Sequence, residues 1–432
     1  MKIIFNHYLI MFASIVMICL SSIAIFNWLV DPYWIYRNVE IDGVNKVKPL
    51  FRTHISMAKA HLVNKIKPQG IILGSSRSGY GLDPEHSGWS TSSVYNLSLP
   101  GTSIYELMRY FQHATADNSV KEVVLALDFF MFNGQREYKT DFEEKRLKVD
   151  KDGKHNIMEI VYDIPETLFS IDSLWASIKT LRSQNNTNSY LANGQRNWTS
   201  YASRIKKVDG YRNMFHLVEK EYLVDHWWFS SCHRYDFIET DTNKSTLRYL
   251  KTIISSAYKN NIKLHVIISP NHARFLEVIR AADLWEVYEQ WKRMLVSLNE
   301  SESINSGKAA FKIWDFTGYD AYNSEQVPLK IEPNRVMKWF WEPSHYKAEL
   351  GTILLNRVFE LDKHSDEVYS SYGVVLSSEN IERHLEKIRS DRLVYINLHQ
   401  DDVLEIKNLA EETENWRIKE KCKQLIKNGI QR

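Results

Sequence analysis

The chain is 432 residues long, carries a formal net charge of +2 and has 25% charged residues. Because this charge is close to neutral and no basic stripe carries interleaved aromatic residues, the composition argues against a nucleic-acid partner. The 13 Trp and 23 Tyr are typical of a protein that handles sugars or meets a membrane interface, although most such side chains only pack. Three cysteines, Cys19, Cys232 and Cys422, show no metal-binding spacing, and whether the last two form a disulfide stays open.

The N-terminal segment predicts a membrane anchor. Residues 8–30 contain no charged residue, and this length is about what a helix needs to cross a hydrocarbon core. An Asp-Pro-Tyr-Trp run at 31–34 then places aromatic residues at the far interface. The alternative is a signal peptide cleaved after Ser-Ile-Ala at 22–24, but the apolar run continues past that point. We therefore expect residues 1–34 to be a short tail and a transmembrane anchor, with the bulk of the chain outside the cytoplasmic membrane.

Apolar runs rich in β-branched residues alternate with helical patterns along much of the remaining chain. The runs that predict buried strands lie at 70–73, 94–97, 123–130, 264–269 and 312–316. Helical spacing covers about 102–116, 247–258, 276–298 and 345–361. This alternation predicts an α/β fold, a flavodoxin-like three-layer arrangement of a five-stranded parallel sheet with helices on both faces.

The expected domain boundaries follow from where this alternation holds. Residues 35–364 form the α/β domain, interrupted by an insertion at about 135–250 that is helical over 164–181. The insertion either shapes a substrate site or covers the sheet. Its Trp-Trp pair at 227–228 either stacks on a sugar or packs in the core. Beyond these, residues 365–432 are expected to be a charged, helical C-terminal tail.

Two strand ends carry residues suited to a binding site. Gly74, Ser75 and Ser76 follow the strand at 70–73, where a parallel strand gives way to a helix. Open α/β sheets build their sites outside the carboxyl ends of their strands. A serine here on its own is most simply a helix N-cap. The next strand is followed by Gly101, where the backbone can approach a ligand closely.

A third feature is Glu342, which precedes His345 by three residues at the start of the last predicted helix. A carboxylate at this spacing can accept the Nδ1–H of the imidazole, which leaves Nε2 to take a proton from a serine hydroxyl. The alternative is an exposed carboxylate beside a histidine that caps the helix.

Taken in order, strand–Gly-Ser-Ser, strand–Asn-x-x-x-x-Gly and acid-x-x-His resemble the SGNH (GDSL-like) hydrolase superfamily. The similarity is to its membrane-anchored, extracytoplasmic branch, which includes proteins of alginate acetylation and of lipoteichoic-acid D-alanylation. The resemblance covers roughly residues 68–360 and rests on three short blocks. It implies a serine-dependent acyl-ester chemistry without selecting a substrate.

The resemblance also implies roles for individual residues. Ser76 takes the place of the nucleophile and His345 that of the base. Glu342 is the orienting acid at a position where the family usually has Asp, and Asp315 and Asp320 are the alternatives. The backbone N–H of Ser76 or Arg77, together with that of Gly101, would form the oxyanion hole.

One block departs from the family pattern. Where the family supplies an Asn as a further oxyanion donor, this chain has Asp128, and an ionised carboxylate cannot donate. Either another donor such as Arg77 replaces it, or the activity is low or transferase-like. His272 follows the fourth predicted strand and either contacts the substrate region or caps the turn after Pro270.

These observations favour a membrane-anchored serine enzyme that transfers an acyl group, most simply acetyl, to an extracytoplasmic glycan. A carbohydrate or lipid esterase is the alternative, and a non-catalytic SGNH-like scaffold in polysaccharide assembly is the rival of another class. The expected partners are a glycan or acyl-ester substrate, the membrane and a membrane protein that donates the acyl group. We expect no cofactor and no metal.

Overall fold

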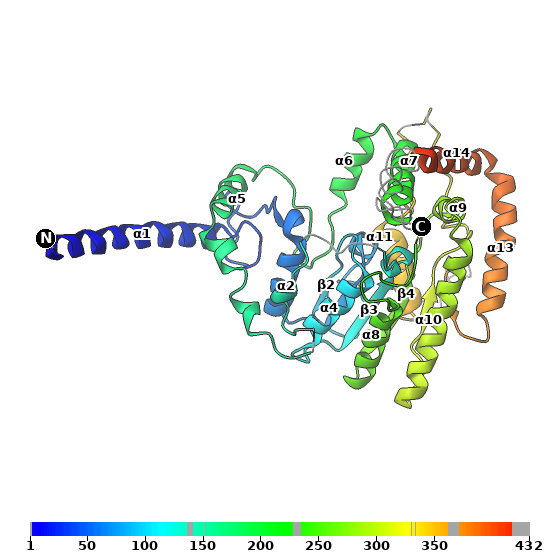
Figure 1. Ribbon diagram of the computed structural model, residues 1–432. Coiled ribbons are helices and arrows are strands. Elements are labelled where there is room, and N and C mark those ends of the chain that lie inside the picture. Colours follow the sequence, from blue (N-terminus) through cyan, green and yellow to red (C-terminus); the bar gives the residue numbers. More distant parts are fainter. Residues whose placement is uncertain are drawn as a thin grey trace, which may run out of the picture. The chain divides into compact units, whose positions relative to one another are not determined.

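The computed structural model describes residues 2–135, 141–151, 153–227, 235–329, 331–332, 334–361 and 371–416 (Figure 1). It divides into two compact units. The first comprises Met1–Lys67, Gln112–Ala116 and Thr140–Ala192, and the second comprises Pro68–Phe111, Asp117–Lys139 and Asn193–Arg432. The insertion expected at 135–250 is thus divided between them. Cys232, Cys422 and Trp228 lie outside the described residues.

The first unit is built from helices. Its elements are α1 (Lys2–Val30), η1 (Phe51–His54), α2 (Ile55–Ile66), η3 (Glu144–Arg146), η4 (Ile157–Ile160), η5 (Pro165–Phe169) and α5 (Ile171–Arg182). Within α1, the stretch Phe5–Val30 has a mean hydropathy of 2.6, and only Asn27 and Val30 near its end are buried. In the part of the chain that the structure describes, this is the one helix that is long and apolar enough to cross a membrane.

The end of α1 is fastened to the first unit. Asn27 donates from Nδ2 to the Leu168 carbonyl at 2.9 Å, and the Lys48 ammonium donates to the Val30 carbonyl at 2.9 Å. A cation at this point also complements the negative end of the helix dipole. Tyr33 and Trp34, which we expected at the membrane interface, are instead buried within the unit, where they pack the chain that leaves α1.

The second unit contains a six-stranded sheet in the order β2-β1-β3-β4-β5-β6. The first five strands in this order are parallel, and β6 is antiparallel to β5. Their bounds are β1 (Gly70–Leu73), β2 (Val94–Asn96), β3 (Glu122–Leu127), β4 (Lys263–Ile268), β5 (Ile313–Asp315) and β6 (Val374–Leu376). The α/β class and the mostly parallel sheet are confirmed. The number of strands was wrong by one, because β6 comes from the segment that we assigned to the tail.

Apolar residues on both faces explain why the central strand forms. All six residues of β3 are buried, as expected for a parallel strand that is covered on both sides. Helix α8 contacts β4 and α10, whereas α3 contacts α11. The helices and turns of this unit are α3 (Ser76–Gly81), α4 (Ile104–Thr115, whose end belongs to the first unit), η2 (Phe129–Phe132), α6 (Thr199–Lys207), α7 (Tyr211–Glu221), η6 (Tyr222–Trp227), α8 (Leu247–Lys259), α9 (Ala273–Ala281), α10 (Trp285–Ser306), α11 (Ala348–Val358), α13 (Ile381–Leu398) and α14 (Gln400–Trp416).

The C-terminal helices pack against the second unit. Helix α14 contacts α7 and α9, beside which it lies in Figure 1. At this contact the guanidinium of Arg274, which is fully buried, donates to Glu219 at 2.7 Å and to Asp402 at 2.8 Å. Asp402 belongs to α14, so the C-terminal helix supplies a second counter-ion, beside Glu219, to a buried charge in α9.

Candidate active site

The turn after β1 is shaped by a glycine and a helix cap. A Cβ on Gly74 would collide with the Ser78 hydroxyl and would lie 2.9 Å from the Ala126 side chain, so only glycine fits. Ser75 caps α3 by accepting from the Arg77 N–H at 3.1 Å. Ser76 is the first residue of the helix, and it therefore stands at the carboxyl end of a parallel strand.

Ser76, His345 and Glu342 form one hydrogen-bonded chain. The Ser76 Oγ lies 2.7 Å from the His345 Nε2, and the His345 Nδ1 is hydrogen-bonded to the Glu342 Oε1. The Ser344 N–H donates to the other carboxylate oxygen at 2.8 Å. Glu342 is completely buried and the His345 side chain is 14% exposed. The hydrogen-bonded series of three residues therefore reaches the surface only at its serine end.

The protein environment shifts the pKa values of His345 and Glu342. Burial lowers the pKa of His345 and outweighs the opposite effect of Glu342. Burial alone would raise the pKa of Glu342, but the charge of His345 and the hydrogen bonds from His345 and Ser344 outweigh it and lower that pKa. At neutral pH the base is therefore a neutral imidazole held by an ionised carboxylate.

The loop that carries the acid and the base is held from several sides. Phe340 and Tyr346 form an antiparallel bridge across it, and the backbone N–H of His272 donates to the Pro343 carbonyl at 2.9 Å. A Cβ on Gly81 would collide with the Tyr346 ring, so the end of α3 and this loop are in direct contact. The loop therefore cannot shift independently of the helix that Ser76 begins.

The carboxylate of Asp128 is paired with other buried side chains and is not free. It accepts from the Ser75 hydroxyl at 2.5 Å and from the Arg77 guanidinium at 3.2 Å, and all three side chains are buried. The same guanidinium donates to the Tyr222 hydroxyl and lies 4.5 Å above the Phe275 ring. Its side chain is thus committed to the interior, which contradicts the expectation that it replaces the missing oxyanion donor.

The backbone donors can also be placed. The Arg77 N–H is used by Ser75, whereas Ser76 opens α3, and the first N–H groups of a helix have no intrahelical acceptor. Gly101 follows β2 with a φ of +61° in the loop that leads to α4. The Leu99 N–H of this loop donates to the Gly74 carbonyl at 2.9 Å, so Gly101 belongs to the same edge of the sheet. Among the described residues, no hydrogen bond joins Gly101 to Ser76.

His272 is a capping residue. Its Nδ1 accepts from the Arg274 N–H at 3.2 Å and its Nε2 donates to the Glu325 carbonyl at 2.6 Å. Burial lowers the pKa of this histidine to about 4, so it is neutral at pH 7. Both ring nitrogens are engaged, which agrees with the capping interpretation rather than with contact to a substrate.

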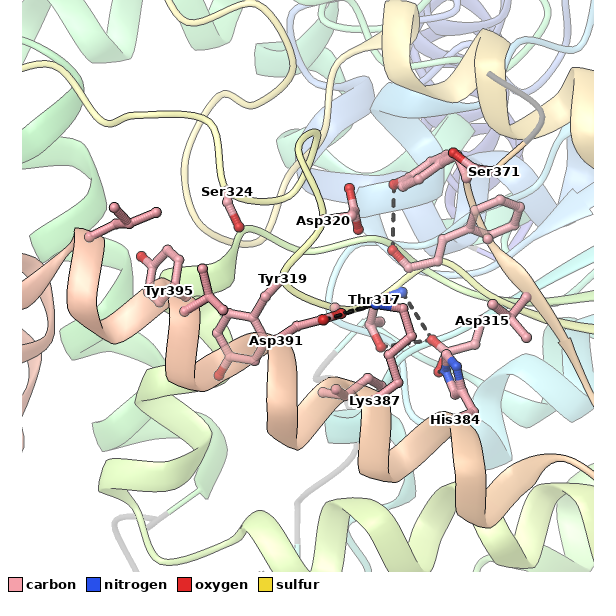
Figure 2. Close-up of a pocket in the computed structure, with 18 of the residues that line it drawn as sticks. Asp315, Thr317, Tyr319, Asp320, Ser324, Ser371, His384, Lys387, Asp391 and Tyr395 are labelled. Atoms are coloured by element: carbon pink, nitrogen blue, oxygen red, sulfur yellow. Dashed lines mark hydrogen bonds and ion pairs between the residues drawn. The ribbon is translucent and has the colours of Figure 1, made fainter. Parts of the chain in front are cut away.

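The alternative acids belong to a different cavity. Asp315 accepts from Lys292 at 2.6 Å and from His384 at 2.9 Å, and Asp320 accepts from Asn323 at 2.6 Å. Figure 2 shows both aspartates at a cavity of about 390 Å³ that is bordered by the loop after β5 and by α13. None of the described hydrogen bonds joins either of them to the base, so Glu342 is the acid that His345 contacts.

Sequence reasoning missed Tyr201, which comes from α6 in the expected insertion. Its hydroxyl donates to the Glu342 Oε1 at 3.1 Å and lies 3.3 Å from the His345 Nδ1. No local motif marks this tyrosine, because its partners are more than 140 positions away. The signal that could have found it is only its position in a segment suspected of shaping the site.

Trp198 was also missed. It is 59% exposed and its indole lies parallel to that of Trp341, with ring centroids 6.2 Å apart. Trp341 in turn contacts the Tyr201 ring. By contrast, Trp227 is fully buried against Phe275 and Tyr222, so the sugar-stacking interpretation fails for the described member of the Trp-Trp pair.

Comparisons of the chain with models of known protein families and with curated protein sequences gave no match. Within the described residues, no group of three or more His, Cys, Asp or Glu side chains could hold a metal ion. The functional interpretation of Ser76, His345 and Glu342 therefore rests on their geometry and on the motifs that surround them.

Proposed function

We propose that this protein is a membrane-anchored, serine-dependent acyl-ester enzyme that transfers an acyl group, most simply acetyl, to an extracytoplasmic glycan. The observation that carries the proposal is the 2.7 Å contact between the Ser76 Oγ and the His345 Nε2, continued by Glu342 on the far side of the imidazole. A hydroxyl, a neutral imidazole and a buried carboxylate in this order are the parts that nucleophilic acyl transfer needs.

The chemistry follows from the order of these groups. His345 takes the proton of Ser76 as its oxygen attacks the ester carbonyl, and Glu342 stabilises the imidazolium that forms. The N–H groups of Ser76 and Gly101 are the candidate donors for the developing oxyanion. Collapse releases the alcohol, which takes the proton from His345, and leaves an acyl-serine. A glycan hydroxyl then attacks the acyl-serine as His345 takes its proton. Collapse of this second intermediate breaks the acyl–Ser76 bond, His345 returns the proton to the Ser76 Oγ, and the glycan ester leaves.

The strand order supports the finer fold assignment. The parallel part of the sheet runs 2-1-3-4-5, which is the flavodoxin-like order, and a three-layer SGNH-type domain is built on such a sheet. Ser76 follows β1 and the acid–base loop follows β5, as the motif resemblance implies.

The membrane segment and the exposed aromatic surface support the choice of substrate and location. Helix α1 would anchor the chain in the cytoplasmic membrane with the bulk of the chain on the extracytoplasmic side, where an acyl-donor membrane protein could supply the acyl group. Trp198 offers an exposed indole that is linked to His345 by three successive ring contacts, through Trp341 and Tyr201. The face of an indole attracts the C–H groups of a pyranose ring, so this residue favours a glycan as the acceptor.

The test uses the full chain in nanodiscs with a fluorogenic acetyl ester and a fluorophosphonate probe. Wild type should hydrolyse the ester and be labelled, whereas Ser76→Ala should lose both by at least about a thousandfold. His345→Ala should lose hydrolysis to a similar extent. Ser92→Ala, which removes an exposed serine of the same unit, is the matched control and should match wild type. Labelling that persists in Ser76→Ala would reject this serine as the nucleophile.

One observation favours the rival from another class. Asp128 is fully used by Ser75 and Arg77, so the third block supplies no side-chain oxyanion donor. A non-catalytic scaffold should neither be labelled by the fluorophosphonate nor turn over any ester. An esterase differs from a transferase in the fate of the acyl group: addition of a glycan acceptor should speed consumption of the ester only for the transferase.

A further inference from the structure

Helix α5, in the first unit, has the reverse of the usual pattern of buried and exposed residues. Its exposed residues include large apolar side chains, with Ile171 72% and Trp175 62% exposed, beside the charged Asp172, Lys179 and Arg182. The face that it buries carries small or polar side chains, namely Ser173, Ala176, Ser177 and Thr180. A helix on a unit surrounded by water buries its apolar stripe and exposes its polar side chains. A fully aqueous environment therefore does not explain the pattern of buried and exposed residues in α5.

The buried face of α5 lies against the end of α1. The Ser177 Oγ donates to the Asn27 Oδ1 at 2.8 Å, and Asn27 also holds the Leu168 carbonyl just before α5. Figure 1 shows α5 beside the last turns of α1. Small side chains let two helices approach closely, and the hydrogen bonds between them need no water.

The length of α1 places this contact near a membrane surface. The 26 residues of Phe5–Val30 form a helix about 39 Å long, at 1.5 Å per residue. This exceeds the roughly 30 Å of a hydrocarbon core, so the last turns extend into the layer of lipid headgroups. Trp28 is exposed in these turns, and tryptophan prefers that layer.

We propose that α5 lies in the interfacial layer of the membrane that α1 crosses, with Ile171 and Trp175 in contact with acyl chains. Lipid is the occupant because α5 packs against the end of α1, the part of that helix expected at the membrane surface. Exposed Asp172 and Lys179 flank these apolar side chains, where they can reach the headgroups. The first unit would then touch the bilayer through a second helix and would not turn freely about α1.

The test measures how deep single positions of the full chain lie in nanodiscs. Cys19, Cys232 and Cys422 are replaced by Ser, and a nitroxide is attached to Ile171→Cys or to Trp175→Cys. The accessibility of the label to oxygen, which concentrates in lipid, is compared with its accessibility to a water-soluble nickel chelate. Met17→Cys in α1 is the lipid control, and Ile304→Cys, an exposed apolar position at the end of α10, is the water control.

The proposal expects the ratio of oxygen to nickel accessibility at 171 and 175 to approach the value at 17 and to exceed clearly the value at 304. A ratio equal to that at 304 would mean that α5 faces water and would overturn the proposal. Low accessibility to both reagents would mean that a protein surface covers α5, either a second copy or a partner, and would overturn it as well. Because no catalytic residue is changed, the result is independent of the proposed enzyme function.

Discussion

At the scale of single residues, the base acts only while His345 is neutral, because an imidazolium cannot accept the proton of Ser76. Burial lowers the pKa of His345 below its ordinary value of 6.5. A lowered pKa extends the neutral form to lower pH, so kcat/KM for an acetyl ester should rise with pH along an acidic limb centred below 6.5 and be flat near pH 7. A pH–rate profile checks this, and a limb centred above 6.5 would contradict it.

The variant Tyr201→Phe tests whether Tyr201 influences the base, His345, through its hydrogen bond to Glu342. It removes a hydrogen bond that positions the Glu342 carboxylate against the imidazole, so the base is held less well and kcat should fall about tenfold, or about 1.5 kcal/mol, with KM unchanged. A carboxylate with one donor fewer stabilises the imidazolium more strongly, so the acidic limb should move to higher pH. Tyr235→Phe, which loses a buried bond to the Phe129 carbonyl, is the matched control and should leave that limb in place. An unmoved limb in Tyr201→Phe would make its role purely structural.

How much of the site could be predicted depended on how local each signal was. Ser76 and the Glu342–His345 pair each belong to a short motif next to a strand or helix end, and the structure brings all three together. The side chain of Arg77 could not be assigned correctly, because its pairing with Asp128 depends on which strand lies beside β1. Which strands are neighbours is decided by the folded sheet and cannot be predicted from the spacing of residues within one short segment.

At the scale of elements, the segment 193–201 is fixed to β2 and to α3, the helix that begins with Ser76. The Asn96 N–H donates to the Asn193 carbonyl at 2.8 Å, and the Arg196 N–H donates to the Gly79 carbonyl at 2.8 Å. Gly194 between them has a φ of +83°. This attachment explains how a segment of the expected insertion brings Tyr201 to the acid.

Gly194→Ala should detach this segment. The new Cβ would collide with the Asn96 carbonyl oxygen and lie 2.8 Å from the Tyr95 ring, in addition to the strain of a positive φ. We expect the free energy of unfolding to fall by about 3 kcal/mol, with a loss of kcat. Gly307→Ala is the control, because its φ is +64° but its Cβ would meet nothing within 4 Å, so it should cost about 1 kcal/mol. Urea unfolding of both variants measures the difference, and equal costs would contradict the close packing.

Element boundaries show where periodicity misleads. The helical pattern over 276–298 continues through Asp283, but this residue adopts a φ of +59° and separates α9 from α10. The pattern over 164–181 is likewise interrupted at Ser170, which caps α5. Side-chain spacing reports which face is apolar and does not register a single residue that leaves the helical conformation. β6 was missed because its three residues lie in a segment that is otherwise charged and helical in pattern, outside the alternation of apolar runs and helices.

At the scale of the whole molecule, the C-terminal segment completes the second unit. Asp402 of α14 neutralises Arg274, and His384 of α13 donates to Asp315 at the end of β5. Asp402→Ala should lower the free energy of unfolding by about 3 kcal/mol, because it leaves a buried charge with fewer partners. Asp401→Ala, the exposed neighbour, should change it by less than about 0.5 kcal/mol. Similar effects in chemical denaturation of the two variants would show that α14 is not needed for stability.

The distance along the chain between the nucleophile and its base has a consequence for biosynthesis. Ser76 and His345 are 269 positions apart, and the loop that carries His345 is held by residues on both sides of it. A nascent chain therefore exposes the serine long before the histidine leaves the ribosome. Until then Ser76 lacks the base that the proposed mechanism requires and is an ordinary alcohol. Under that mechanism, reactivity toward esters begins only after His345 has been synthesised and its loop has folded, and chains that end earlier would not react.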